Sequence, residues 1–149
     1  MRIALLSCAL IGCAYKPGSF ASGERGFPGQ RTTVGCFDVA VERRTDLPIG
    51  PVLGYQFANR CDHPTTVDLG ALAVIGRDTA GAEIALRAYD PHAELHPVTI
   101  EARNIGAESL AYPSREAMSQ VCVDVSTFAG AQPTRWLCFG AAPAVGRLP

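Results

Sequence analysis

Apolar side chains fall on every second position in several segments of the chain, which is the pattern of half-buried β-strands. The alternation is clearest in residues 37–42, 55–57, 84–88 and 121–126. Residues 67–75 form a longer, nearly continuous apolar run, which is typical of a central strand covered on both faces. Because no segment carries a convincing helical period, the pattern predicts a chain built almost entirely of strands.

Turn-forming residues separate these segments at intervals of about ten residues, as in antiparallel sandwiches and barrels. The sequence Asp78-Thr79-Ala80-Gly81 predicts a tight turn and a hairpin over residues 70–89. Two more antiparallel pairs are expected, 36–43 with 53–60 and 119–126 with 134–139, with weaker strands at 98–103 and 109–112. We therefore predict an all-β, antiparallel, immunoglobulin-like β-sandwich of about seven or eight strands. Trp136, two residues before Cys138, is expected to pack against a disulfide in its core.

The N-terminal residues have a different character, because one positive charge, Arg2, is followed by a short apolar run at residues 3–12. This layout is typical of a signal peptide. A run of ten residues is too short to cross a bilayer as a helix, which needs about 20. A buried strand is the alternative, but the segment leads into residues that show no core-forming pattern.

The run ends in Leu10-Ile11-Gly12-Cys13, which resembles the lipobox of bacterial lipoproteins. The resemblance implies lipidation of the Cys13 thiol, cleavage before Cys13 and acylation of the new amino group. Several acyl chains on one residue anchor a protein stably in a membrane, whereas a single chain holds only marginally. A second candidate, Cys8, would leave a very short signal. Ala14 follows the cysteine, which in the enteric-type sorting rule favours the outer membrane.

The chain then divides into four parts by composition. Residues 1–12 are the expected signal peptide, and residues 13–33, rich in Gly, Pro and Ser, are expected to form a lipidated flexible tether. Residues 34–140 hold the strand pattern and are predicted to form the single β-sandwich domain. Residues 141–149 are rich in Ala, Pro and Gly and are expected to form an irregular tail.

The six cysteines agree with an oxidising compartment. Cys8 leaves with the signal and Cys13 takes the lipid, so an even set of four remains, without a metal-ligand spacing. The predicted strand pairs favour two disulfides. The alternative is an inter-sheet arrangement that joins Cys61 to Cys122 and Cys36 to Cys138. The favoured bonds are Cys36–Cys61 and Cys122–Cys138.

The net charge and the motif content leave several classes of function without support. The formal net charge is −1 and there is no basic cluster, so nucleic-acid binding has no electrostatic support. The chain has no Gly-x-Ser-x-Gly, Ser-x-x-Lys or phosphate-binding glycine motif, and no catalytic residue is assigned. Asp38, Asp68 and Asp124 are expected to face solvent, and Arg43 and Arg44 are expected at a solvated hairpin tip.

One segment carries metal-ligand side chains, namely Asp90, His92, Glu94 and His96. In an extended chain these alternate positions project from one face, and imidazole with carboxylate groups suits zinc, copper or iron. His63, in another loop, is a further candidate ligand. Prolines at both ends of the segment favour an exposed polar loop instead, so no cofactor is expected beyond a divalent metal at this segment.

Three functional hypotheses follow. The first is a non-enzymatic envelope lipoprotein that is held to the membrane by its N-terminal lipid and binds or supports an envelope protein or glycan. The second is a metal-binding envelope module that uses the Asp90/His92/Glu94/His96 segment. The third is an envelope hydrolase without a recognisable motif, because the fold class alone excludes none.

Overall fold

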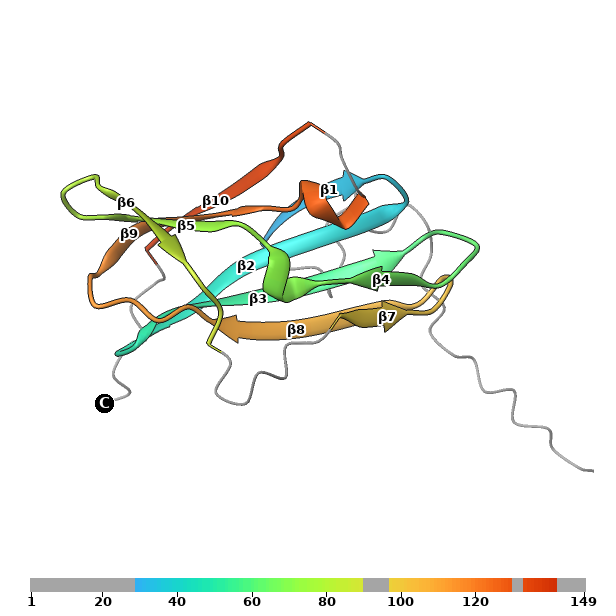
Figure 1. Cartoon of the computed structure of the whole chain (residues 1–149), viewed down its shortest axis with the longest axis horizontal. Coiled ribbons are helices and arrows are strands. Elements are labelled where there is room, and N and C mark those ends of the chain that lie inside the picture. Colours follow the sequence, from blue (N-terminus) through green and yellow to red (C-terminus); the bar gives the residue numbers. More distant parts are fainter. Residues whose placement is uncertain (1–28, 90–96, 130–132, 142–149) are drawn as a thin grey trace, which may run out of the picture.

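The computed structural model describes residues 29–89, 97–129 and 133–141, which form a β-structure of ten strands (Figure 1). The alternation of apolar and polar residues explains most of these strands, since it gives each one a buried face. Two short 3-10 helices, η1 (Leu69–Ala71) and η2 (Ser126–Ala129), interrupt them. The strands are β1 (Gln30–Val34), β2 (Phe37–Leu47), β3 (Gly50–Asn59), β4 (Thr65–Val67), β5 (Val74–Asp78), β6 (Glu83–Leu86), β7 (Val98–Ile100), β8 (Ile105–Ala111), β9 (Met118–Asp124) and β10 (Trp136–Gly140).

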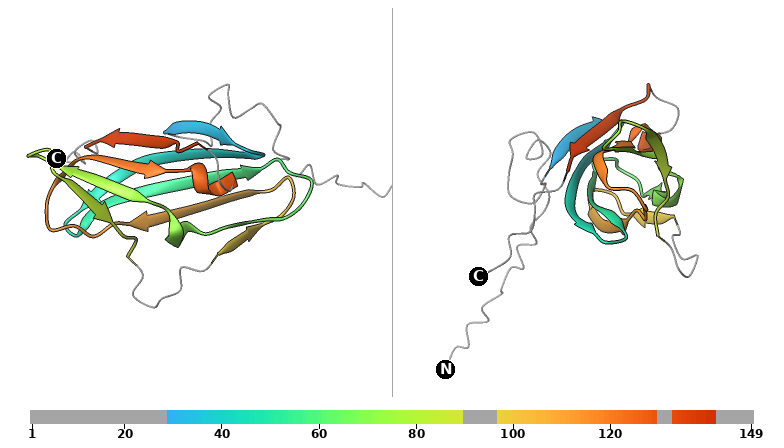
Figure 2. Two further views of the ribbon diagram at one scale, coloured as in Figure 1. Left: turned by 45° about the horizontal axis from the view of Figure 1, so that its top comes forward. Right: turned by 90° about the vertical axis from the view of Figure 1, so that its left-hand side faces the viewer.

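The strands form two four-stranded antiparallel sheets that face each other (Figure 2). The first sheet has the order β1-β2-β3-β8, and the second has the order β10-β9-β5-β6. A small two-stranded ladder, β4 with β7, completes the structure. The inner faces of the two sheets enclose one apolar core. In this core the ring centroids of Phe57 and Phe128 lie 5.8 Å apart.

Side chains bridge the two sheets along one side, where β1 and β10 lie next to each other (Figure 2). The Gln30 amide donates to the carbonyl oxygen of Cys138 on β10. The Arg135 guanidinium donates to the carbonyl oxygen of Thr33 on β1 at 2.9 Å. On the opposite side, the Tyr89 N–H donates to the carbonyl oxygen of Ala111 at the end of β8. Both long sides of the sandwich are therefore joined.

Both favoured disulfides are confirmed, and the inter-sheet alternative is wrong. Cys36–Cys61 closes the open end of the β2–β3 pair, because Phe37 lies opposite Asn59 in the register. Cys122–Cys138 joins two residues that face each other on β9 and β10. Each bond crosslinks neighbouring strands, and a disulfide of this kind contributes about 2–4 kcal/mol.

The predicted all-β antiparallel class is confirmed, but its immunoglobulin-like arrangement is not. An immunoglobulin constant-type domain places strands A, B, E and D in one sheet and C, F and G in the other. Here the first three strands are neighbours in sequence order within one sheet. The strand count also differs from seven or eight, because β1 lies almost wholly within the range predicted as a tether, and the predicted strand over 67–75 is divided.

Asp68 is the reason that residues 67–75 do not form one strand. Its side-chain oxygen accepts hydrogen bonds from the N–H groups of Gly70 and Ala71 and so caps η1. A short side chain that bonds the backbone locally competes with strand pairing. The apolar run therefore splits into β4, η1 and β5, and the buried side chains Val67, Leu69, Leu72 and Val74 still reach the core.

Two of the carboxylates expected in solvent are buried instead. Asp38 accepts a hydrogen bond from the Thr33 hydroxyl and lies 3.4 Å from the Arg60 guanidinium. Asp124 accepts from the backbone N–H of Ser126 at 2.9 Å, which organises the turn into η2. Their burial is explained by these partners, since a carboxylate is buried at low cost only when its oxygens are bonded.

A pair of tyrosines makes a polar contact inside the core. The hydroxyl groups of Tyr55 and Tyr112 lie 2.5 Å apart, and both side chains are almost fully buried. Burial raises the pKa of Tyr112 to about 12 and that of Tyr55 well above its ordinary value. The fold therefore keeps both groups protonated at a pH where an unfolded chain ionises its tyrosines.

Alkaline pH is expected to destabilise the domain through this pair. In the unfolded chain each tyrosine ionises near pH 10. In the folded chain both pKa values are higher, so stability is complete below about pH 10 and falls as the pH approaches 12. Chemical denaturation across this range should show a smaller loss in a Tyr55→Phe/Tyr112→Phe variant than in the wild type. An equal loss in both proteins would contradict the assignment.

Candidate binding cavity

The predicted metal segment and lipidation site both lie outside the described residues. Asp90, His92, Glu94 and His96 fall in the gap at 90–96, and Leu10-Ile11-Gly12-Cys13 precedes residue 29. The remaining candidate histidine, His63, is exposed, and its Nδ1 lies 2.9 Å from the carboxylate of Asp62. Across residues 29–89, 97–129 and 133–141, no three metal-ligand side chains gather at one place. The same residues include no helix long and apolar enough to cross a membrane.

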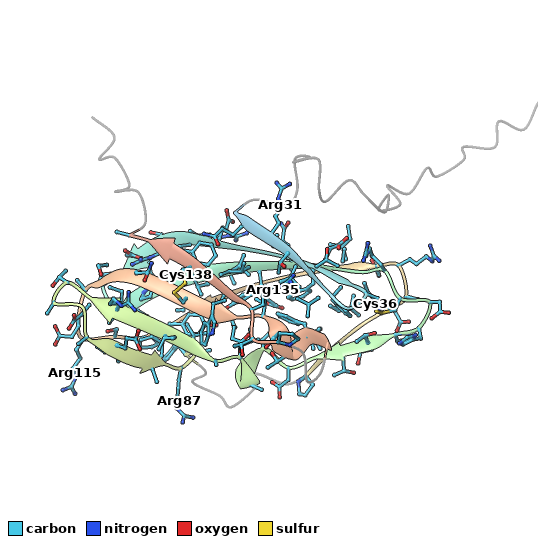
Figure 3. All side chains as sticks on the ribbon, turned by 90° about the horizontal axis from the view of Figure 1, so that it is seen from above. Arg31, Cys36, Arg87, Arg115, Arg135 and Cys138 are labelled. Carbon is cyan, nitrogen blue, oxygen red and sulfur yellow. A yellow bond between two sulfur atoms is a disulfide. The ribbon has the colours of Figure 1, made fainter. Side chains whose placement is uncertain are left out.

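A cavity of about 540 Å³ opens at one end of the sandwich, between the tip of the β2–β3 hairpin and the start of β9. It lies at the end opposite the Cys36–Cys61 disulfide, where Arg115 is labelled in Figure 3. Its volume is in the range of pockets that bind small molecules or side chains. The wall is mainly apolar with charged groups among it, and is formed by Arg43, Asp46, Leu47, Pro48, Gly50, Pro51, Thr79, Ser114, Arg115, Glu116, Ala117, Met118, Ser119 and Ala141.

The hairpin tip and the segment after β8 are fixed to each other by backbone hydrogen bonds. The Tyr112 N–H donates to the carbonyl oxygen of Pro51, and the Ser114 N–H donates to that of Ile49 at 2.7 Å. Gly50 permits this contact, since it has a φ of +141° and an added Cβ would lie 2.1 Å from the Tyr112 carbonyl oxygen. This wall of the cavity is therefore built on two backbone segments that are hydrogen-bonded to each other.

A β-bulge in β2 gives the cavity its ion pair. The register between β2 and β3 shifts between Arg43 and Thr45, so β2 contains one extra residue there. Residues three apart in a regular strand point to opposite faces. With the extra residue, Asp46 comes to the same side as Arg43, and the two side chains form a bidentate pair at 2.8 Å.

Arg43 also holds the two sheets together at the cavity. Its Nη1 donates to the carbonyl oxygen of Gly140 on β10, and its Nη2 donates to that of Met118 on β9, both at 2.7 Å. The side chain is buried, which contradicts the expectation of a solvated hairpin tip at this position. Arg44 fits that expectation better, because it is exposed and bonds Glu42 and Ser109 on the outer surface.

The hydroxyl groups in the cavity wall are already used by the backbone. Ser114 Oγ accepts from the Glu116 N–H and donates to the Glu116 carbonyl oxygen. Ser119 Oγ donates to the carbonyl oxygens of Arg77 and Asp78. The wall contains no histidine or cysteine, and in the described residues the hydrogen bonds of both serine hydroxyls go to backbone groups rather than to the carboxylates of Asp46 or Glu116. This arrangement is suited to binding, with Arg115 and Glu116 as exposed groups of opposite charge.

An open strand edge lies next to the cavity. On the side away from β3, β2 pairs with β1 only as far as Val41, so residues 42–47 have no strand partner there among the described residues. At the hairpin tip, the exposed side chains of Leu47 and Ile49 extend the apolar surface beyond the cavity. An open edge beside an apolar pocket offers both backbone and side-chain recognition.

The sequence held only partial signals for this site. The tip Leu47-Pro48-Ile49-Gly50 is more apolar than a hairpin turn requires, which is one detectable sign of a binding surface. The bulge that turns Arg43 inward has no comparable signature, since Arg43-Arg44 resembles any charged strand end. Comparison of the chain with protein-family models, with characterised proteins and with solved structures finds no match.

Proposed function

We propose that the protein is a lipid-anchored, non-enzymatic binding module of a bacterial cell envelope, and that it holds an extended peptide segment of an envelope protein at the end cavity. The observation that carries this proposal is the cavity of about 540 Å³ beside residues 42–47 of β2, an edge that has no strand partner in the part of the chain that the structure describes. An extended peptide adds to such an edge through its backbone and places one side chain in the adjacent pocket.

The anchor part of the proposal rests on the sequence and on the cysteine pairing together. The segment Leu10-Ile11-Gly12-Cys13 resembles a lipobox, and the cysteines of the domain are paired as Cys36–Cys61 and Cys122–Cys138. Of the six cysteines, only Cys8 and Cys13 then remain, and both precede the domain. Structural disulfides are typical of extracytoplasmic proteins, which agrees with export to the envelope.

The binding part rests on the chemistry of the cavity wall. Leu47, Pro51 and Met118 supply apolar contact for a buried side chain. Arg115 and Glu116 supply charges of both signs at the rim, which favour a mixed-charge peptide over an anionic polymer. Because Ser114 and Ser119 are bonded to backbone, the wall supports binding better than hydrolysis.

Filling the cavity is expected to weaken peptide binding strongly without unfolding the domain. Ala117 is exposed and lines the cavity, so an Ala117→Trp substitution places an indole in the opening. Peptides selected by the wild-type protein from a random phage-displayed library should bind Ala117→Trp about ten-fold more weakly or worse, measured by calorimetry.

A matched substitution controls for the added indole. Ala107 is an exposed alanine in the middle of β8, opposite Gln56 and away from the cavity. Ala107→Trp should keep the wild-type affinity for the selected peptides. The proposal is overturned if the library yields no binder, or if the two tryptophan variants lose affinity equally.

A further inference from the structure

The second sheet carries a different surface on its outer face, centred on Trp136. This residue lies on β10, two positions before Cys138, so both side chains project from the same face of the sheet. Trp136 is 40% exposed, which contradicts the expectation of a core residue. The neighbouring inward positions, Leu137 and Phe139, fill the core in its place.

The strand register sets a regular pattern of side chains beside the indole. Cys138, Cys122 and Ile75 face one another across three strands, so the disulfide and one aliphatic side chain form an apolar row. A second row, the polar row, lies on the same outer face two residues further along the strands. It consists of Gln120, Arg77 and Glu83. Figure 3 shows the Cys138 disulfide on this sheet, far from the labelled Cys36.

The polar row is held in place by its own hydrogen bonds. The Arg77 guanidinium donates to Glu83 Oε1 at 2.6 Å and to Gln120 Oε1 at 3.3 Å. All three side chains end in flat groups, and together they offer N–H donors and a carboxylate acceptor. Because Arg77 is bonded to both Glu83 and Gln120, the three side chains are oriented before a ligand arrives. This orientation lowers the entropy cost of binding.

One hollow of about 130 Å³ is lined by Trp136, by Cys122 and Ile75 of the apolar row, and by the whole polar row. A second hollow, of about 350 Å³, shares Trp136 and Ile75 with the first and extends past Leu72 to Arg87. The indole therefore lines both hollows, and the second one also reaches the core side chains Leu86 and Tyr112. The smaller one is well below the volume of a pocket for a drug-sized ligand, so it suits a single ring of a longer molecule.

We propose that this face is a glycan-binding site for a chain of β-linked pyranose rings, with one ring over the Trp136 indole and neighbouring rings in the two hollows. A pyranose ring has C–H groups on its faces, which pack on an aromatic ring, and hydroxyl groups at its edge. Each hydroxyl both donates and accepts, and therefore matches Arg77, Gln120 and Glu83.

A protein partner fits this face less well. Trp136 is the one large apolar side chain in the strands of the second sheet, as far as the structure describes them, that is strongly exposed. Stable protein interfaces need a buried area of about 1,200 Å² or more, usually with a wider apolar centre. This face is also distinct from the end cavity, because the two share no lining residue.

The single tryptophan makes the test direct, since the intrinsic indole fluorescence comes from Trp136 alone. The full-length protein is titrated with β-1,4-linked tetramers of glucose and of N-acetylglucosamine. At least one tetramer should shift the emission to shorter wavelength and protect the indole from acrylamide quenching. Calorimetry should then show a loss of affinity of about ten-fold or more for Trp136→Ala, and a smaller loss for Trp136→Phe, which keeps an aromatic ring.

A matched control separates this site from the end cavity. Ile49 is 48% exposed at the hairpin tip, and Ile49→Ala should leave oligosaccharide affinity unchanged. The Gln120→Ala variant, which keeps the indole, should also bind more weakly than the wild type. The inference is overturned if neither tetramer binds, or if Trp136→Ala binds as the wild type does, and neither result bears on peptide binding at the cavity.

Discussion

Replacing Asn59 by alanine is expected to lower the free energy of unfolding by about 3 kcal/mol, which is a large share of the stability of a small domain. Asn59 lies at the end of β3 and is fully buried. Its side-chain nitrogen donates to the carbonyl oxygens of His63 at 3.0 Å and Ile100 at 2.9 Å. Its side-chain oxygen accepts from the Cys61 N–H at 2.8 Å.

The size of the effect follows from what the substitution leaves behind. One side chain satisfies backbone groups from two separate segments, the turn after Cys61 and the turn that leads from β7 to β8. A buried carbonyl or N–H without a partner costs about 1–3 kcal/mol. Since the methyl group of an alanine offers no replacement, several such groups would lose their partners together, near the Cys36–Cys61 disulfide.

Two further variants make the measurement specific. Asn104 is exposed in the turn before β8, where its side chain accepts from the Ile105 N–H, so Asn104→Ala should cost about 0.5 kcal/mol or less. Asn59→Asp keeps the shape but directs a carboxylate at the His63 and Ile100 carbonyl oxygens, and should destabilise more than Asn59→Ala near neutral pH. Urea denaturation measures all three. Similar losses for Asn59→Ala and Asn104→Ala would refute the assigned role.

Replacing Cys13 by serine is expected to release the protein from the membrane. If Leu10-Ile11-Gly12-Cys13 is a lipobox, the thiol of Cys13 is the group that receives diacylglycerol, and serine cannot replace it. The loss of all acyl chains removes stable anchoring rather than weakening it. Membrane fractionation should therefore move most of the protein to the soluble fraction, and processing should lose its sensitivity to globomycin, an inhibitor of lipoprotein signal peptidase.

Cys8 provides the matched control, because it is the other cysteine outside the two disulfides. Cys8→Ser leaves Leu10-Ile11-Gly12-Cys13 intact and should stay in the membrane fraction. Neither change touches the domain, so the thermal unfolding of both proteins should match. Membrane retention of Cys13→Ser would exclude the lipid anchor and leave the sites on the domain unaffected.

The parts of the fold that the sequence predicts well are those with local patterns. The alternation of apolar and polar residues predicts β2, β3 and β9. The pairing of β2 with β3 then predicts the Cys36–Cys61 disulfide, because the two cysteines lie at neighbouring strand ends. The hairpin of β5 and β6 follows from a turn signal at residues 78–81. In each case the information lies within a few consecutive residues, which is why it can be read without the tertiary structure.

The parts that the sequence does not predict depend on single side chains that act over a distance. Arg43 is buried only because a bulge turns it toward carbonyl oxygens of two other strands. Asp68 breaks an apolar run by capping three residues of η1. For Trp136, a usable signal was present, since Leu137 and Phe139 also alternate and place Trp136 and Cys138 on the opposite face.

The side-chain bridges between β1 and β10 have a consequence for self-association. A strand edge with unbonded carbonyl oxygens is a template on which another copy can add its own strand, the first step toward aggregation. Gln30 and Arg135 already donate to carbonyl oxygens of Cys138 and Thr33 along this seam, so those positions are not available to a second copy. On a protein held to a surface by the proposed lipid anchor, copies would meet often, and these two positions would then give a neighbouring copy no free carbonyl oxygen to pair with.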